Sequence, residues 1–152
     1  MVTATLTANA LTRTSAFHAV IEDATTIENV TNALNGAFAD CTNLLSVSSE
    51  SVTNIGGFAF YYCVTLEGFD FPLVTNIGNS AFYACSLLTA VEFPPTLLEI
   101  GGQAFGNCIA LTEITFNTQI PPGISINSFI SVPNVATRTL YVPCPDFYTS
   151  RT

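Results

Sequence analysis

Four of the five cysteines recur along the middle of the chain at nearly constant spacing, which makes them the first candidates for chemistry. Successive members lie 22, 22 and 23 residues apart, and they are Cys41, Cys63, Cys85 and Cys108. Cysteine side chains can bind a metal ion, form disulfides, or lie in the interior as small hydrophobic groups. Each possibility needs a different arrangement in space, so the elements that position the cysteines decide among them.

Phenylalanine and leucine follow the same spacing as the cysteines. An Ala-Phe pair precedes each cysteine, with the phenylalanine three residues before it, and a leucine follows three residues after it. The phenylalanines are Phe38, Phe60, Phe82 and Phe105. A fixed period of this length indicates a solenoid, in which each repeat forms one coil stacked on the next.

Stacking of this kind favours buried thiols over the other two cysteine chemistries. Strands in neighbouring coils lie ~4.8 Å apart, so four equivalent cysteines extend over roughly 14 Å and cannot converge on one tetrahedral zinc ion. Adjacent Cα atoms fall within disulfide range, but equivalent side chains point in parallel rather than at each other. We therefore expect no metal site, a ladder of buried thiols, and a phenylalanine column that forms core rather than a ligand pocket. Cys144 lies outside the ladder and is the expected reactive thiol.

Within each repeat the sequence predicts a short strand, a turn, a second short extended segment, and a helical turn that carries the Ala-Phe pair and the cysteine. The strand begins at the leucine, and its inward residues include those three and five places later, as in Leu88, Val91 and Phe93. A glycine that permits a tight bend of positive φ follows the second segment. These glycines are Gly56, Gly78 and Gly101.

We expect one mostly β domain with three regions. Residues 1–29 are predicted to form an irregular N-terminal cap or a degenerate repeat, because the ends of a solenoid need atypical units. Residues 30–116 contain four repeats of 22–23 residues, and residues 117–152 contain a last degenerate repeat and a C-terminal cap. In this last region Ser128-Phe129 continues the phenylalanine column, and residues 140–143 read as a terminal strand.

A strip of polar residues is predicted to face outward from the first strand of each repeat. Side chains alternate along a strand, so residues two and four places after the leucine point away from the core. The candidate binding residues on this strip or directly beside it are Ser46, Ser48, Glu67, Asp70, Glu92, Glu113 and Thr115. Paired carboxylates could perform acid–base chemistry or bind calcium, but no nucleophile, phosphate-binding loop or calcium-binding loop accompanies them. The alternative is a solvated face that opposes aggregation.

The composition excludes several classes of function. The chain is 49% hydrophobic with 12 phenylalanines, which excludes disorder, yet no apolar run approaches the ~18 residues of a membrane span. The net charge of −8, with three arginines and no lysine, argues against binding to nucleic acid or anionic membranes. His18 is the sole histidine and lies away from the repeats, so a Ser-His-Asp or Cys-His site is not expected. We predict no enzyme and no cofactor.

Low charge together with many threonine, serine and asparagine residues favours an extracellular, cell-surface or assembled protein. The given chain has no basic start followed by an apolar core, so a signal peptide is either removed or not used. Asn29-Val30-Thr31 matches the glycosylation sequon, which matters in a host that glycosylates.

The repeated pattern Leu-x-x-Val-x-Phe-Pro, followed by Val-Thr-x-Ile-Gly-x-x-Ala-Phe-x-x-Cys, resembles the BspA-like leucine-rich repeats. The match covers about residues 30–116 and extends more loosely to Val142. The resemblance implies a right-handed leucine-rich-repeat solenoid with short parallel strands. It also implies a bacterial or protist surface protein used in adhesion and protein binding. Unlike other leucine-rich repeats, this chain has its cysteine before the strand, so their binding modes do not carry over.

Two functions follow as expectations. The first is a non-catalytic, surface-exposed module for adhesion or protein binding, whose partner is a protein or cell-surface ligand that docks on the strand strip. The second is a self-assembling structural subunit of a filament, surface layer or particle. The low charge fraction and the exposed strand edges of a solenoid favour the second reading. The net charge of −8 and the irregular caps favour the first.

Overall fold

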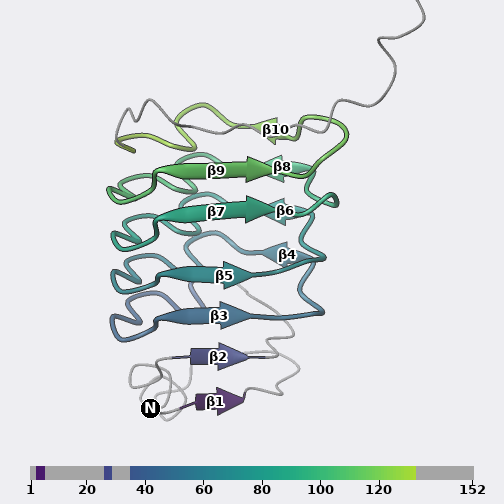
Figure 1. Cartoon of the computed structure of the whole chain (residues 1–152). Helices are drawn as coiled ribbons and strands as arrows, with labels where there is room; N and C mark the ends of the chain where they lie inside the picture. The colour runs from purple at the N-terminus through teal and green to yellow at the C-terminus, as the bar shows by residue number, and fades with distance from the viewer. Residues whose placement is uncertain (1–2, 6–25, 29–34, 133–152) are drawn as a thin grey trace, which may run out of the picture.

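The protein forms a stack of similar coils, as the sequence predicts for a solenoid (Figure 1). The computed structural model describes residues 3–5, 26–28 and 35–132. Each complete coil in this part contains a strand, a turn, a shorter second strand, and a run of tight turns that leads into the next coil. Every strand pairing is parallel.

The first ladder contains one strand from each of six coils. Its members are β1 (Thr3–Thr5), β2 (Thr26–Glu28), β3 (Ser46–Ser48), β5 (Gly68–Asp70), β7 (Ala90–Phe93) and β9 (Glu113–Phe116). The first four form one sheet, β7 and β9 pair with each other, and β7 lies against β5. Equivalent residues are partners, as with Val47 and Phe69 or Val91 and Ile114. The division into caps and repeats remains a prediction, although β1 and β2 continue the ladder into residues 1–29.

The second ladder is built from the shorter strands. They are β4 (Asn54–Ile55), β6 (Asn76–Ile77), β8 (Glu99–Ile100) and β10 (Gly123–Ile124). The isoleucines of the first three are buried, which confirms the predicted second extended segment. The extra residue of the 23-residue step lies at Pro94-Pro95, because the next buried residue after Phe93 is Leu97, whereas Val74 follows Phe71 after one residue fewer.

The predicted helical turn is wrong, because the described residues contain no helix. Backbone N–H groups of this segment alternate between two kinds of partner. The N–H of Phe60 donates to the carbonyl of Ala81 in the next coil at 2.7 Å, whereas that of Tyr61 donates to the carbonyl of Phe58 at 3.2 Å. A helix would direct its N–H groups to carbonyls within its own segment. Alternating turns instead hold neighbouring coils together and still leave the backbone paired.

The predicted positive φ of Gly56, Gly78 and Gly101 is also wrong. Gly36 is the one glycine with positive φ in the described part of the chain. Positive φ occurs two residues after each predicted glycine, at Phe58, Ser80 and Gln103, with values of 59°, 54° and 56°. The two glycines whose surroundings are resolved are needed for close approach of backbones. A Cβ on Gly78 would lie 2.5 Å from the nitrogen of Gly57, and one on Gly101 would lie 2.7 Å from the nitrogen of Asn79.

Replacing Gly78 with alanine should therefore destabilise the fold. The added Cβ meets backbone atoms of Gly56 and Gly57 that cannot rotate away, and overpacking of this kind costs about 1–3 kcal/mol. Chemical denaturation would measure the loss. Gly68→Ala is the matched control, because its Cβ would have no neighbour within 4 Å. Equal stabilities for the two variants would contradict the close approach of the coils.

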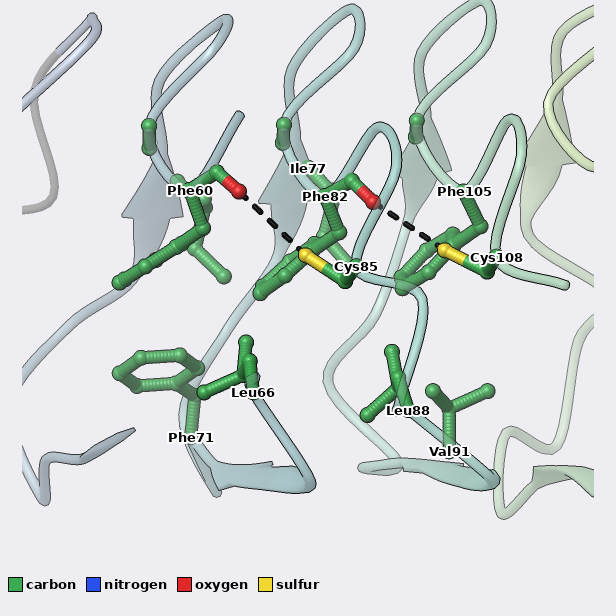
Figure 2. Packing of buried hydrophobic residues seen from close by; sticks show 14 of the residues in the cluster. Phe60, Leu66, Phe71, Ile77, Phe82, Cys85, Leu88, Val91, Phe105 and Cys108 are labelled. Atoms are coloured by element: carbon green, nitrogen blue, oxygen red, sulfur yellow. Dashed lines mark hydrogen bonds between the residues drawn. The ribbon is translucent and has the colours of Figure 1, made fainter. Parts of the chain in front are cut away.

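A column of stacked phenylalanine rings runs through the core. The ring centroids of Phe38 and Phe60, of Phe60 and Phe82, and of Phe82 and Phe105 lie 5.0, 5.0 and 5.1 Å apart. Phe129 continues the column at 5.3 Å from Phe105, as its spacing predicts. Figure 2 shows these rings entering the core from the turn segments, opposite the inward side chains of the first ladder. The turn segments and the first ladder thus cover opposite sides of one core.

Candidate functional site

The outward residues of β3, β5, β7 and β9, together with Glu67 beside β5, form a surface that we call the strand face. Its four carboxylates are exposed and its serines and threonine are partly exposed. The predicted residues lie here in register: Ser48 is the partner of Asp70, Glu92 of Thr115, and Ala90 of Glu113. The full predicted set consists of Ser46, Ser48, Glu67, Asp70, Glu92, Glu113 and Thr115. Its use in binding remains a prediction.

A hollow of about 410 Å³ opens beside two of these carboxylates, Asp70 and Glu92. The side-chain amide of Asn117 also lines it and donates a hydrogen bond to Oε1 of Glu92 at 2.7 Å. The remaining lining is formed by Phe69, Phe71, Pro72, Pro94 and Pro95. Two carboxylates beside rigid prolines provide a polar recess suited to a hydrogen-bond donor or a cation. Sequence reasoning missed Asn117, although it occupies the place that Pro72 and Pro94 hold in the preceding coils.

The four ladder cysteines are buried and free, which confirms the predicted thiols. Each of the last three donates its S–H to the carbonyl of a phenylalanine in the preceding coil. The Sγ of Cys85 lies 3.3 Å from the carbonyl oxygen of Phe60, and that of Cys108 lies 3.1 Å from that of Phe82 (Figure 2). Cys63 makes the same bond to Phe38 at 3.0 Å. The cysteines therefore satisfy buried carbonyl groups in addition to filling space.

Their surroundings hold these thiols in the protonated form. Hydrogen bonding with the side chain of Cys41, followed by burial, raises the pKa of Cys63. Burial raises the pKa of Cys85 and raises the pKa of Cys108 to about 12. Because the thiolate is the nucleophile and the metal ligand, thiols in this state do not react. The predicted reactive thiol, Cys144, lies outside the described residues.

Other predicted features fall outside the described part of the chain or receive no site within it. His18, the sequon at Asn29 and the strand at residues 140–143 all lie outside the described ranges. Across residues 3–5, 26–28 and 35–132, no three His, Cys, Asp or Glu side chains gather in a way that could hold a metal ion. The same residues include no helix of the length and apolar character that a membrane crossing requires.

Sequence reasoning missed a group of aromatic rings on the turn side, which we call the turn-face aromatic cluster. It consists of Phe58, Tyr61, Tyr62 and Tyr83. The rings of Tyr61 and Tyr83 are stacked with centroids 5.3 Å apart, and Tyr62 lies 4.7 Å from Tyr61. The available signal was compositional, because three of the five tyrosines fall between the second and third ladder cysteines, at the start and end of which stand Phe60 and Cys85.

Comparison with known proteins identifies similar repeats. The family profile described as BspA type leucine rich repeat region matches residues 13–136 in 6 copies. Among solved structures, a leucine rich cell surface protein from Faecalibacterium prausnitzii A2-165 is 26% identical and superposes with a TM-score of 0.55. The similarity covers 76% of this chain and 38% of that protein, so the chain corresponds to well under half of it. No curated protein matches the chain.

Proposed function

Because the chain belongs to the BspA-type leucine-rich repeat family, we propose that it is a non-catalytic, cell-surface module that binds proteins through the strand face. The similar solved protein is a leucine rich cell surface protein, which supports a surface location. A solenoid offers an extended surface built from equivalent positions of successive coils, and such surfaces commonly bind proteins.

The acidic column on the strand face is the observation that carries the proposal. Asp70, Glu92 and Glu113 are exposed on successive strands, and the hollow beside Asp70 and Glu92 interrupts an otherwise regular surface. The described residues hold no lysine or arginine that could neutralise these carboxylates. A complementary partner is therefore basic, because opposite potentials steer association and discriminate among partners.

Changing Asp70 and Glu92 together to serine should weaken binding without unfolding the protein. Exposed substitutions usually change stability by about 0.5 kcal/mol or less. Binding would be measured by surface plasmon resonance at several salt concentrations, against purified extracellular proteins that range from acidic to basic. We expect the parent to prefer basic partners, and the variant to associate roughly tenfold more slowly at low salt. Its salt dependence should also be flatter.

The matched control removes the same charge from elsewhere. Glu50 and Glu99 are both exposed, and neither belongs to the strand face, so Glu50→Ser with Glu99→Ser tests the effect of net charge alone. If the control loses as much binding as the strand-face variant, or if the strand-face variant binds as the parent does, the proposal fails.

Self-assembly is the second candidate, and exposed isoleucines favour it. Ile120, Ile124 and Ile126 are 80%, 49% and 87% exposed, and they surround β10, the terminal strand of the second ladder among the described residues. A strand edge flanked by apolar side chains invites pairing with another copy. Sedimentation velocity over a range of concentrations would detect assemblies. Ile124→Thr with Ile126→Thr should abolish them while the strand-face variant retains them, and a parent that sediments as a monomer throughout would eliminate this candidate.

A further inference from the structure

The turn-face aromatic cluster contains two residues in a backbone conformation that does not suit them. Phe58 and Tyr62 have φ values of 59° and 57°, in the left-handed region where bulky side chains are rare and strained. At the positions equivalent to Phe58 the other coils have small or polar residues, namely Gly36, Ser80, Gln103 and Asn127. At the positions equivalent to Tyr62 they have Asp40, Ala84, Asn107 and Ser131. One coil therefore carries two aromatic residues where every other described coil carries none.

Burial does not explain this choice. Phe58 is 50% exposed and Tyr62 is 42% exposed, so neither ring gains the full benefit of leaving water. Backbone strain that is not offset locally is characteristic of functional positions. The strained residues also form one group, since Phe58 meets Tyr61 edge-on at 5.5 Å and Tyr62 lies 6.2 Å from Tyr83.

The rest of the cluster is built as a rigid support. Tyr83 lies so close to Gly106 that a Cβ there would be 2.8 Å from a ring carbon, so the glycine makes room for the ring. The side-chain amide of Asn107 donates a hydrogen bond to the Tyr83 hydroxyl at 2.6 Å. With Tyr61 stacked on Tyr83, two rings are fixed and two are presented to solvent. A preorganised surface of this kind loses little conformational entropy on binding.

Charge indicates what such a surface would bind. The backbone N–H of Asp40 donates to the carbonyl of Tyr61, which places Asp40 beside the cluster in the preceding coil. Partial burial, and then Tyr62, Tyr83 and Asp40, raise the pKa of Tyr61, so the carboxylate acts on these rings. Aromatic faces carry negative potential, and a neighbouring carboxylate adds to it. The described residues contain no lysine or arginine to occupy the surface.

We propose that the turn-face aromatic cluster, with Asp40, is a binding site for an arginine side chain of a partner protein. A guanidinium group is planar, stacks on aromatic faces, and forms charged hydrogen bonds with carboxylates. This site goes beyond the proposed strand-face function and is independent of it, because the two surfaces lie on opposite sides of the core (Figure 2).

The test uses the full chain and three synthetic peptides of equal length, in which Gly-Ser pairs alternate with arginine, lysine or citrulline. Citrulline is a neutral, planar counterpart of arginine, so it isolates the contribution of charge. Three of the five tyrosines belong to the cluster and the protein has no tryptophan, which makes tyrosine ring resonances a direct readout of the titration. We expect the arginine peptide to bind about tenfold more tightly than the citrulline peptide, and to shift these resonances.

Two paired variants separate binding from folding. Phe58→Asn with Tyr62→Asn installs residues that tolerate positive φ, so stability should stay unchanged or rise, while affinity for the arginine peptide should fall about tenfold. Phe58→Leu with Tyr62→Leu keeps apolar surface but removes the rings, and it should lose the preference for arginine over citrulline. Neither pair alters net charge, so non-specific attraction to an acidic protein cannot account for the loss.

Several results would overturn the proposal. Equal affinities for the arginine and citrulline peptides would exclude recognition of a cation. Retained preference in the leucine variant would show that the rings are not needed. Binding of neutral mannan at the cluster in place of the arginine peptide would assign the surface to carbohydrate. Loss of arginine binding in the Asp70→Ser, Glu92→Ser variant would place the site on the strand face instead, and that variant is otherwise expected to bind as the parent does.

Discussion

Replacing Phe82 with alanine is expected to lower the free energy of unfolding by about 3–5 kcal/mol, the usual cost of deleting a buried phenylalanine ring. The Phe82 side chain has no exposed area. Its ring is stacked between those of Phe60 and Phe105 at 5.0 and 5.1 Å, and it lies 4.5 Å from the ring of Phe69. Chemical denaturation at neutral pH would measure the loss.

A matched control is available one coil earlier. Phe58 is half-exposed and has positive φ, so Phe58→Ala removes a ring of the same size with little loss of buried contact. Its effect should stay within about 1 kcal/mol. Similar losses for both variants would mean that the stacked column is not the main source of stability at this level of the solenoid.

Alkaline pH is expected to destabilise the fold steeply, by about 4 kcal/mol per pH unit above pH ~9. The pKa values of Cys63, Cys85 and Cys108 are raised from an ordinary value of 9.0. Below pH 9 these thiols are protonated in both the folded and the unfolded chain, so the stabilisation is fully present. Above it the unfolded chain releases three protons that the folded chain retains, and each contributes about 1.4 kcal/mol per pH unit. The slope decreases near pH 12, where folded Cys108 itself ionises.

Denaturation curves at half-unit intervals from pH 8 upward would test this dependence. Cys85→Ala supplies the control, because it removes one of the three retained protons and should reduce the slope by about a third, whatever it costs at neutral pH. A slope that is unchanged in this variant would mean that Cys85 does not remain protonated in the folded protein.

The parts of the fold that depend on spacing were predictable from the sequence. A period of 22–23 residues that carries Phe, Cys and Leu together fixes which side chains stack, and it placed Phe82 in the column and Cys85 in the thiol ladder. Alternation along the strands likewise placed Asp70 and Glu92 outward. These features follow from hydrophobic periodicity, which is the strongest structural signal that a single sequence carries.

The turn segments were not predictable by the same reasoning. Buried residues three apart, such as Phe60 and Cys63, fit both a helical turn and a series of tight turns, and the difference lies in whether N–H groups bond within the coil or to the next one. Gly78 looked like a positive-φ glycine, but it is required by the closeness of Gly57. Large residues are poor candidates for positive φ, so nothing local to Phe58 or Tyr62 revealed the aromatic cluster.

The ladder of bonds between coils determines how the molecule should respond to tension. Each coil holds 22 residues between equivalent positions such as Ser46 and Gly68. Extended chain spans at most ~3.3–3.6 Å per residue, so detaching one coil releases roughly 75 Å of length. Pulled from its two ends, the stack would peel coil by coil rather than rupture at once, since each coil contacts its neighbours alone. A tether built in this way lengthens under load at nearly constant force and shortens again when the load is removed.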